Sequence, residues 1–278
     1  MASRAAPMDP SAAPSVEAED FTHRHLRRVG KRVHRMGIAC NMGLDADAFS
    51  AALDRGANYI FWTSLRTGAV TPVLREALRR DRERYVVASG PSVAVTGGNV
   101  TRGVESLLKK LGTDYLDVYQ LFWVGVASSW REATADALAK LKEQGKIRAS
   151  GVSIHDRPRA AEMSQDERLD LLMIRYNAAH PGAERDIFPR FSARRPDVAA
   201  YTATSWRKLL KRPPGWEAKV PDAGDCYRFA LSSPHVDVVI SGPGDRAQME
   251  ANFDALARGP LSPEEDRWMR ELGEVVHG

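Results

Sequence analysis

The chain has 278 residues, 43% of them hydrophobic, so it can bury a substantial core in one large domain or two small ones. Its 40 basic and 36 acidic residues leave a net charge of only +4, and the basic runs at 23–35 and 79–84 fit a solvated surface better than a nucleic-acid interface. No stretch approaches the roughly 18 consecutive apolar residues that a membrane span requires.

Residues 1–21 show no helix-like or strand-like spacing of apolar residues. Residues 1–21 are rich in Ala, Pro and Ser and lack the apolar segment of a signal peptide, which predicts a disordered tail before a single domain at 22–278. Cys40 and Cys226 have neither disulfide nor metal-ligand spacing, so we predict no metal site and expect a reducing, cytoplasmic compartment.

The first half of the domain alternates between strand and helix patterns. Two very short strands around a turn at Gly30 come first, within 23–33. We then predict strands at 36–40, 58–62 and 85–89 and helices at 45–55, 71–80 and 98–111. The second of these helices opens with Thr71-Pro72, a favourable start because proline is well tolerated in the first helical turn.

The stretch 104–156 gives the clearest pattern. A helix ending near Leu111, an apolar strand ending in Phe122-Trp123, an amphipathic helix ending at Gly145 and a strand through Gly151-Val152-Ser153 follow one another. A helix between two apolar strands implies a parallel sheet with right-handed crossovers.

The same alternation continues to the end of the chain. We predict strands at 171–176, 197–201 and 236–240 and helices near 184–188 and at 223–232, 245–256 and 263–275. Eight strands over about 255 residues predict a (β/α)8 TIM barrel with a short N-terminal β-hairpin lid and a C-terminal helix. A doubly wound dinucleotide-binding fold is less favoured because no GxGxxG follows the first strand.

Several short segments occur in the order found in a known family. They are Gly56-Ala57-Asn58-Tyr59, Leu111-Gly112-Thr113-Asp114-Tyr115-Leu116-Asp117, Tyr119-Gln120-Leu121, Leu141-Lys142-Glu143-Gln144-Gly145-Lys146-Ile147-Arg148, Gly151-Val152-Ser153, Tyr176-Asn177, Ala200-Tyr201 and Glu250-Ala251-Asn252. In these segments, over nearly the whole domain, the sequence resembles the aldo-keto reductase superfamily. The resemblance implies an NADP(H)-linked carbonyl reductase that uses an Asp, Tyr, Lys and His tetrad at the strand ends.

The four tetrad positions hold other residues here. The resemblance places the aspartate at Phe61, the tyrosine at or near Arg66, the lysine at Gly90 and the histidine at Phe122. Hydride delivery to a carbonyl creates an oxyanion that needs a proton donor, and the donor tyrosine needs neighbours that adjust its pKa. We therefore expect ordinary carbonyl reduction to be impaired, because function depends on the site rather than the fold.

On the cofactor side the agreement with the family is partial. The resemblance assigns a nicotinamide nucleotide, NADP or NAD, to a set of positions around the strand ends: Ser153, Asn177, Tyr201, Ser241, Gly242, Gly244, Arg246 and Asn252. The residues that often read the adenosine 2′-phosphate correspond to Gly242 and Gln248, so selectivity for NADP is not predicted, and Arg246 is a candidate substitute. The possibility that no nucleotide binds stays open.

Other residues at the strand ends suggest different chemistry. Four aromatic residues could form an apolar clamp for a flat ligand or pack into the barrel wall: Phe61, Trp62, Phe122 and Trp123. Of these, Trp62, Phe122 and Trp123 are the candidate substrate-site residues. The candidate catalytic residues are His155, His180, Tyr176 and Arg66, each with a purely structural alternative. Asp156 is expected to cap a helix and Cys40 to be a buried thiol.

Three interpretations are open at this stage. The chain is a family homologue that keeps the nucleotide with altered or lost turnover, a non-catalytic barrel that binds a nucleotide or an aromatic ligand, or a different enzyme such as a lyase or isomerase. We expect a small-molecule ligand and a monomer or weak homo-oligomer, with neither nucleic acid nor membrane as partner.

Overall fold

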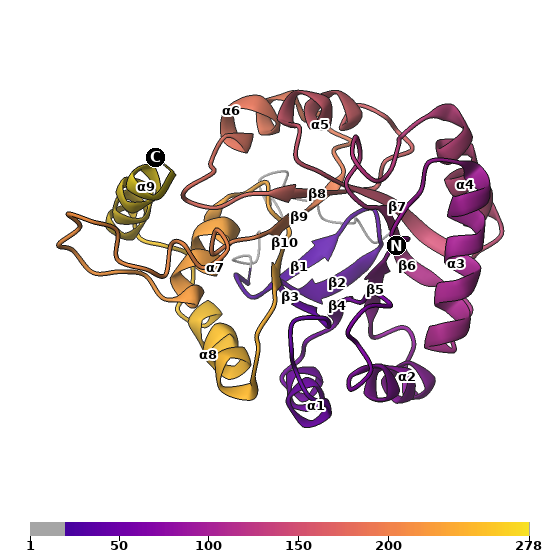
Figure 1. Cartoon of the computed structure of the whole chain (residues 1–278), viewed down its shortest axis with the longest axis horizontal. Helices are drawn as coiled ribbons and strands as arrows, with labels where there is room; N and C mark the ends of the chain where they lie inside the picture. The colour runs from indigo at the N-terminus through magenta and orange to yellow at the C-terminus, as the bar shows by residue number, and fades with distance from the viewer. Residues whose placement is uncertain (1–19, 278) are drawn as a thin grey trace, which may run out of the picture.

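The computed structural model describes residues 20–277 and contains a closed barrel of eight parallel strands surrounded by helices (Figure 1). The predicted tail at 1–21 lies almost entirely outside the described residues. In spatial order the barrel strands are β10 (Val238–Ser241), β3 (Met36–Ala39), β4 (Tyr59–Phe61), β5 (Val86–Ser89), β6 (Leu116–Leu121), β7 (Ile147–Ile154), β8 (Leu171–Arg175) and β9 (Asp197–Tyr201), and β9 pairs with β10 to close the ring. The predicted fold class is confirmed.

The helices lie outside the barrel and follow the strands in chain order (Figure 1). They are α1 (Ala46–Asp54), α2 (Thr71–Arg80), α3 (Gly97–Leu111), α4 (Glu132–Glu143), α5 (Arg157–Met163), α6 (Ala183–Asp186), the 3-10 turn η1 (Phe188–Arg190), α7 (Ala223–Ser232), α8 (Arg246–Leu256) and α9 (Pro263–His277). No helix within 20–277 is long and apolar enough to cross a bilayer.

Side-chain alternation along the strands produces two apolar cores. One fills the barrel interior and includes Val86, Ala88, Met173 and Ala199. The other lies between the barrel wall and the helices and includes Val87 and Leu172, the neighbours of the inward-facing residues. The direction of a strand-end side chain, inward or outward, therefore follows from its position along the strand.

Short polar signals fix the helix ends. Asp156 caps α5 by accepting a hydrogen bond from the Arg159 backbone N–H at 3.0 Å, as the sequence predicts. Ser262 and Glu265 form a reciprocal capping box at the start of α9. Gly112 ends α3 in the left-handed conformation, with φ of 65°, which costs glycine little because it has no Cβ.

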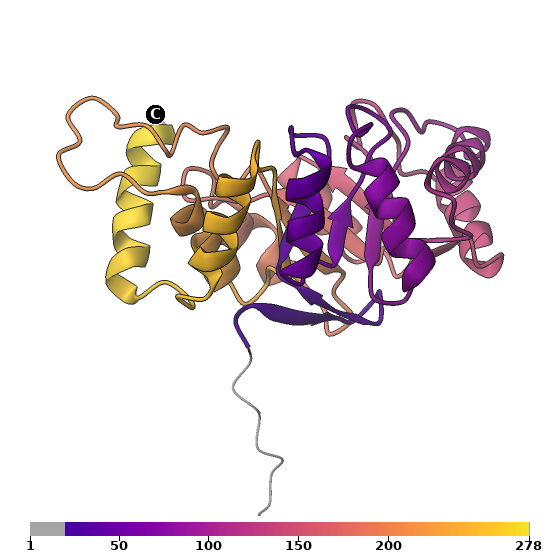
Figure 2. The ribbon, with the colours of Figure 1, turned by 90° about the horizontal axis from the view of Figure 1, so that it is seen from below.

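The N-terminal hairpin, β1 (His23–Leu26) and β2 (Lys31–His34), lies across one end of the barrel (Figure 2). Its turn is anchored to the start of β9, where the Asp197 carboxylate accepts hydrogen bonds from the backbone N–H groups of Arg27 and Arg28, both at 2.9 Å. Leu26 and Val33 are buried in the inner core. The hairpin therefore closes the amino ends of the strands and leaves the carboxyl ends uncovered.

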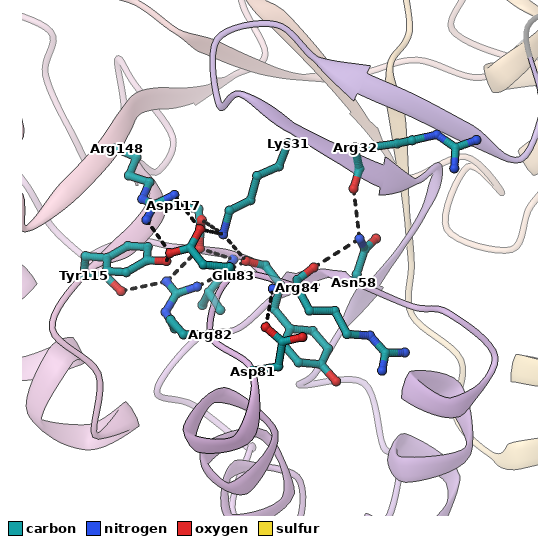
Figure 3. A network of polar contacts seen from close by, with 12 residues as sticks. Lys31, Arg32, Asn58, Asp81, Arg82, Glu83, Arg84, Tyr115, Asp117 and Arg148 are labelled. Atoms are coloured by element: carbon teal, nitrogen blue, oxygen red, sulfur yellow. Dashed lines mark hydrogen bonds and ion pairs between the residues drawn. The ribbon is translucent and has the colours of Figure 1, made fainter.

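A charged network beneath the hairpin completes this closure (Figure 3). Asp117, fully buried near the start of β6, pairs with Lys31 at 2.9 Å and Arg82 at 2.7 Å and accepts the Val87 N–H at 2.9 Å. The Tyr115 ring has the Arg82 guanidinium 3.7 Å from its centroid. Every charge at the centre of this network has an opposite charge or a ring beside it.

Candidate functional site

The carboxyl ends of the barrel strands surround the face opposite the hairpin, which we call the mouth (Figure 2). Met173 belongs to the inner core, so Arg175, two residues further along β8, also faces inward. Arg175 is the register partner of Tyr201 on β9, and Tyr201 packs against the same inner core. These two side chains therefore lie next to each other above the core of the barrel.

His155 directly follows β7 and reaches Tyr201 from the other side of β8. The Tyr201 hydroxyl lies 2.9 Å from His155 Nε2 and 3.2 Å from Nδ1, and the two rings meet edge to face with centroids 5.6 Å apart. Strands β7 and β9 both flank β8 in the barrel. We call His155, Arg175 and Tyr201 the polar half of the mouth.

The polar half is positively charged through Arg175. This guanidinium is half-buried and has no hydrogen bond or ion pair with any residue in 20–277. Burial lowers the pKa of His155, and the charge of Arg175 lowers it further. Burial raises the pKa of Tyr201 to about 12, while Arg175 acts in the opposite direction. Around neutral pH, His155 and Tyr201 are therefore neutral beside a fixed positive charge.

The opposite side of the mouth is apolar. Phe61 at the end of β4 and Phe122 just after β6 pack against each other with ring centroids 5.6 Å apart at a tilt of 59°. Phe61 lies against the inner core, as Tyr201 does, and both phenylalanines are half-buried. We call this pair the apolar half of the mouth. It occupies two of the positions that the resemblance assigns to the tetrad.

The lysine position of the tetrad, Gly90, has no room for a side chain. A Cβ there would lie closer than 3.0 Å to the Gln120 carbonyl oxygen and 3.0 Å from two carbons of the Phe122 ring. The backbone of β6 and the aromatic side chain together fill the space. Gly90 and Phe122 therefore form one packing arrangement at two of the positions that the resemblance assigns to the tetrad.

Arg66, at the tyrosine position, does not join either half. It is exposed in the loop between β4 and α2, with φ of 56°, and forms no ion pair or hydrogen bond with another described residue. A catalytic role for it remains an untested prediction, and the geometry gives it no partner for acid–base chemistry.

Two other predicted catalytic residues lie away from the polar half. Tyr176 is buried in the outer core, where its hydroxyl donates to Glu184 at 2.6 Å and its ring stacks on Phe229. Its neighbour Arg175 faces inward, so Tyr176 faces outward, and we leave it out of the proposed site. His180 contacts the Asn177 side chain at 3.1 Å and packs edge to face on His277 of α9.

The pKa of His180 is lowered to about 4, first by burial and then by nearby positive charges. Those charges are Arg175, His277, Lys208 and Arg157. His180 is thus neutral at pH 7, and it is a neighbour of the polar half rather than a member of it.

Trp62 and Trp123, both predicted for the substrate site, differ sharply. Trp62 is 2% exposed in the outer core, and its indole N–H donates to the Thr71 hydroxyl at 2.9 Å. Trp123 is 53% exposed and has φ of 50°. It lies in a loop where its backbone N–H donates to Ser153 Oγ at 2.9 Å. Of the four predicted aromatic residues Phe61 and Phe122 lie in the mouth wall, whereas Trp62 faces the helices and Trp123 lies in an exposed loop.

Around the mouth the loops carry exposed apolar side chains. All lie between a strand and the following helix, and they are Met42, Leu65, Val93, Val95, Trp123, Val126 and Trp206. We call this set the apolar rim. Outside it, Val275 is the other large hydrophobic residue found exposed within 20–277. Exposed apolar side chains in these loops are available to contact a ligand at the mouth.

The predicted cofactor residues are in two environments. Ser241, Asn252 and Tyr227 form a buried chain of hydrogen bonds, with 3.1 Å from Asn252 Nδ2 to Ser241 Oγ and 3.1 Å from Ser241 Oγ to the Tyr227 hydroxyl. Asn177 is fully buried and donates to the Thr202 carbonyl oxygen at 2.7 Å. Three of the predicted cofactor residues therefore already have hydrogen-bond partners within the protein: Ser241, Asn252 and Asn177.

The turn after β10 is more open but also has internal partners. The Gly244 N–H donates to Gln248 Oε1 at 3.1 Å, and Arg246 pairs with Glu250 at 2.7 Å on the exposed surface of α8. Gly242 is exposed, and a Cβ there would lie 2.6 Å from Cγ of the neighbouring Met42 side chain.

Comparison with known proteins decides the family. The family model described as "Aldo/keto reductase family" matches residues 42–205 of this chain. The chain belongs to the aldo/keto reductase family. Methylglyoxal reductase YeaE of Escherichia coli strain K12 is 31% identical over 225 residues, which is 79% of this chain and 78% of that family member.

Solved structures of aldo-keto reductases show the same fold. The AKR11C1 holo form from Bacillus halodurans has a TM-score of 0.76 and 22% identity, covering 90% of this chain and 96% of that one. An enzyme from Klebsiella pneumoniae in complex with NADP and acetate has a TM-score of 0.70 and 24% identity, covering 89% and 94%. The family and its barrel are therefore established.

A nicotinamide nucleotide, the family's cofactor, fits the nicotinamide end of this mouth. Ser153 Oγ accepts the Trp123 N–H at 2.9 Å and keeps its own proton, which it can donate to a carboxamide oxygen. Tyr201 presents a half-buried ring on β9, which is separated from β7 by β8. Arg175 is not among the candidate residues of the sequence analysis. The alternation from Leu171 through Met173 to Arg175 was the signal that identifies its direction.

Proposed function

We propose that this chain is an aldo/keto reductase homologue that binds nicotinamide nucleotide at the barrel mouth but does not carry out tetrad-dependent carbonyl reduction. The observation that carries the proposal is the filled lysine position, where Gly90 lies against the Gln120 carbonyl oxygen and the Phe122 ring. A side chain cannot be accommodated there without moving the end of β6.

The chemical reason is the fate of the developing oxyanion. A bound reduced nicotinamide supplies the hydride, and the protein must supply a proton donor and a polar environment for the oxygen. At the tetrad positions this chain presents Phe61, Gly90 and Phe122, which can do neither. Loss of general acid catalysis alone costs about 10²–10⁴-fold in rate.

Support for nucleotide binding comes from Ser153 and Tyr201, whose positions fit the carboxamide and the ring of nicotinamide. Because Gly242 and Gln248 occupy the positions that read the 2′-phosphate and Arg246 pairs with Glu250, we expect NADPH and NADH to bind with similar affinity. The proposed partners are therefore a nucleotide and a small molecule. We also propose a cytoplasmic location and a monomer or weak homo-oligomer.

Fluorescence titration with NADPH and NADH, with an aldehyde panel that includes methylglyoxal assayed in parallel, tests the proposal. We expect saturable binding of both nucleotides and aldehyde reduction that stays at the background rate. Turnover at the level of an ordinary carbonyl reductase would show that another residue replaces the tetrad tyrosine. Absence of nucleotide binding would remove the cofactor from the proposal.

The second candidate is a different enzyme on the same barrel, such as a lyase or isomerase. The 2.9 Å contact between His155 and Tyr201 favours it, because a neutral imidazole beside a phenol can take up and return a proton. This candidate gains support if no nucleotide binds and if His155→Ala abolishes whatever activity is found.

A further inference from the structure

We propose that the mouth binds a carboxylate attached to a flat apolar body, with the carboxylate on Arg175, His155 and Tyr201 and the apolar body against Phe61 and Phe122. The inference goes beyond the proposed function, because neither the tetrad nor the nucleotide accounts for an arginine at this position. Three observations support it: the isolation of the Arg175 guanidinium, the positive charge around it and the division of the mouth into a polar and an apolar half.

The first support is the isolation of Arg175. A half-buried guanidinium has lost part of its hydration, and proteins compensate such groups with a carboxylate or other acceptor. Arg175 has neither a hydrogen bond nor an ion pair within the described part of the chain. The planar guanidinium can bind a carboxylate through two parallel N–H···O bonds.

The second support is the sign of the charges around it. The charged groups that shift the pKa values of His155, His180 and Tyr201 are all cations, and Arg175 acts on all three. Lys208 and Arg157 add positive charge on the His180 side. Arg157 is already paired with Asp186 at 2.6 Å, whereas Lys208 forms no ion pair in the described residues. The polar half therefore attracts anions.

The third support is the geometry of the two halves. Tyr201 and Phe61 pack against the same inner core, so the polar and apolar halves lie over one barrel interior. The Tyr201 hydroxyl and the neutral His155 ring carry one O–H and one N–H, and after they bond to each other one of these protons remains to be donated to a carboxylate. Phe61 and Phe122 offer tilted aromatic faces to a flat body. The matching ligand class is an aromatic carboxylate.

Benzoate is the probe, and benzamide is its neutral counterpart of nearly the same shape. Binding of each to the full chain is measured by isothermal titration and ligand-observed NMR, without nucleotide and again with NADPH. We expect benzoate to bind saturably and benzamide to bind at least about 10-fold more weakly, since a charge-assisted hydrogen bond contributes about 10–100-fold to affinity.

Arg175→Gln is the test variant, and Arg66→Gln is the matched control, since both remove an arginine that has no hydrogen bond or ion pair with any residue in 20–277. We expect Arg175→Gln to weaken benzoate binding about 10-fold or more while benzamide binding is unchanged, and Arg66→Gln to leave both within about 2-fold. Circular dichroism and thermal melting establish that each variant is folded.

Equal binding of benzoate and benzamide, or unchanged benzoate affinity in Arg175→Gln, would overturn the proposal, as would the absence of saturable benzoate binding. The NADPH titration reports on the proposed function separately. Benzoate binding without nucleotide binding leaves the carboxylate site standing and removes the nucleotide. Nucleotide binding without benzoate binding supports the proposed function and removes the carboxylate site.

Discussion

The two ends of the barrel use charged residues in opposite ways. At the amino end, beneath the hairpin, buried Asp117 is paired with Lys31 and Arg82 and also accepts a backbone N–H (Figure 3). At the carboxyl end, Arg175 is half-buried and has no hydrogen bond or ion pair with any residue in 20–277, and the apolar rim is exposed. The buried carboxylate at the amino end is therefore paired with cations of the chain, and the half-buried guanidinium at the mouth is not paired among the described residues.

This difference separates stability from binding in a single fold. Saturated polar networks hold elements in place, because removing one partner leaves an uncompensated group. Unsatisfied cations and exposed apolar side chains add little stability, and they are the groups that a ligand can contact. Substitutions at the amino end should therefore act on unfolding, and most substitutions at the mouth should act on binding.

Asp117→Ala should have the largest effect on stability. It leaves Lys31 and Arg82 without their buried anion and the Val87 N–H without an acceptor, which we expect to lower the free energy of unfolding by about 3–5 kcal/mol. Urea denaturation measures the change. Glu83→Gln is the control, because Glu83 is 63% exposed and its loss should cost less than about 1 kcal/mol.

If the two variants unfold at the same urea concentration, the network does not hold the amino end closed.

Acidification should destabilise the amino end through His34. Burial lowers the pKa of His34 from its ordinary 6.5 to about 4, and its Nδ1 accepts the Met36 N–H at 3.1 Å, so the folded state holds it neutral. The unfolded chain binds the proton first, so this contribution is complete above pH 6.5 and is lost as the pH falls toward 4. The expected loss between pH 7 and pH 4.5 is about 2–3 kcal/mol.

His34→Asn keeps an acceptor for the Met36 N–H and removes the titrating ring. Urea denaturation across this pH range should show a smaller loss in the variant than in the natural chain. An equal loss would assign the acid sensitivity to other groups.

Most substitutions at the mouth should change binding, but Gly90→Ala should instead lower the free energy of unfolding. Its Cβ would collide with the Gln120 carbonyl oxygen and the Phe122 ring, and such overpacking costs about 1–3 kcal/mol. Gly68→Ala is the matched control, since a Cβ there meets no atom within 4 Å. Thermal unfolding of both variants measures the difference. Equal melting temperatures would mean that β6 can shift and that the lysine position is not closed.

Trp123→Asn should have the smallest effect. Trp123 is 53% exposed and has φ of 50°, a conformation that asparagine tolerates well. We expect the free energy of unfolding to change by no more than about 0.5 kcal/mol, as measured by urea denaturation. A loss above about 1 kcal/mol would show that the apolar rim contributes to stability.

Local sequence pattern was enough to predict the fold. Helix α2 and strand β9 have the predicted bounds, because the Thr71-Pro72 start and the apolar run at 197–201 are strong local signals. The last strand begins two residues later than predicted. There the Asp237 carboxylate accepts the Val198 N–H at 2.8 Å and pairs with Arg195, long-range contacts that no local pattern reveals.

The candidate site was less predictable for two physical reasons. Trp62 and Tyr176 are strand-end residues that face the helices, and strict use of side-chain alternation would have excluded them from the mouth. The contact between His155 and Tyr201 joins residues 46 positions apart on either side of β8, so it depends on strand order and register. Local sequence pattern predicts neither the strand order nor the register.

The anchoring of the hairpin also bears on how the chain folds during synthesis. The hairpin at 23–34 is made before the barrel strands, yet it is fastened by Asp117, Asp197 and Asp237, which emerge from the ribosome progressively later. Its docking must therefore wait until strands about 200 residues further along the chain have been made. Contacts of such long sequence separation slow folding, so the nascent hairpin should stay accessible to chaperones until the barrel closes.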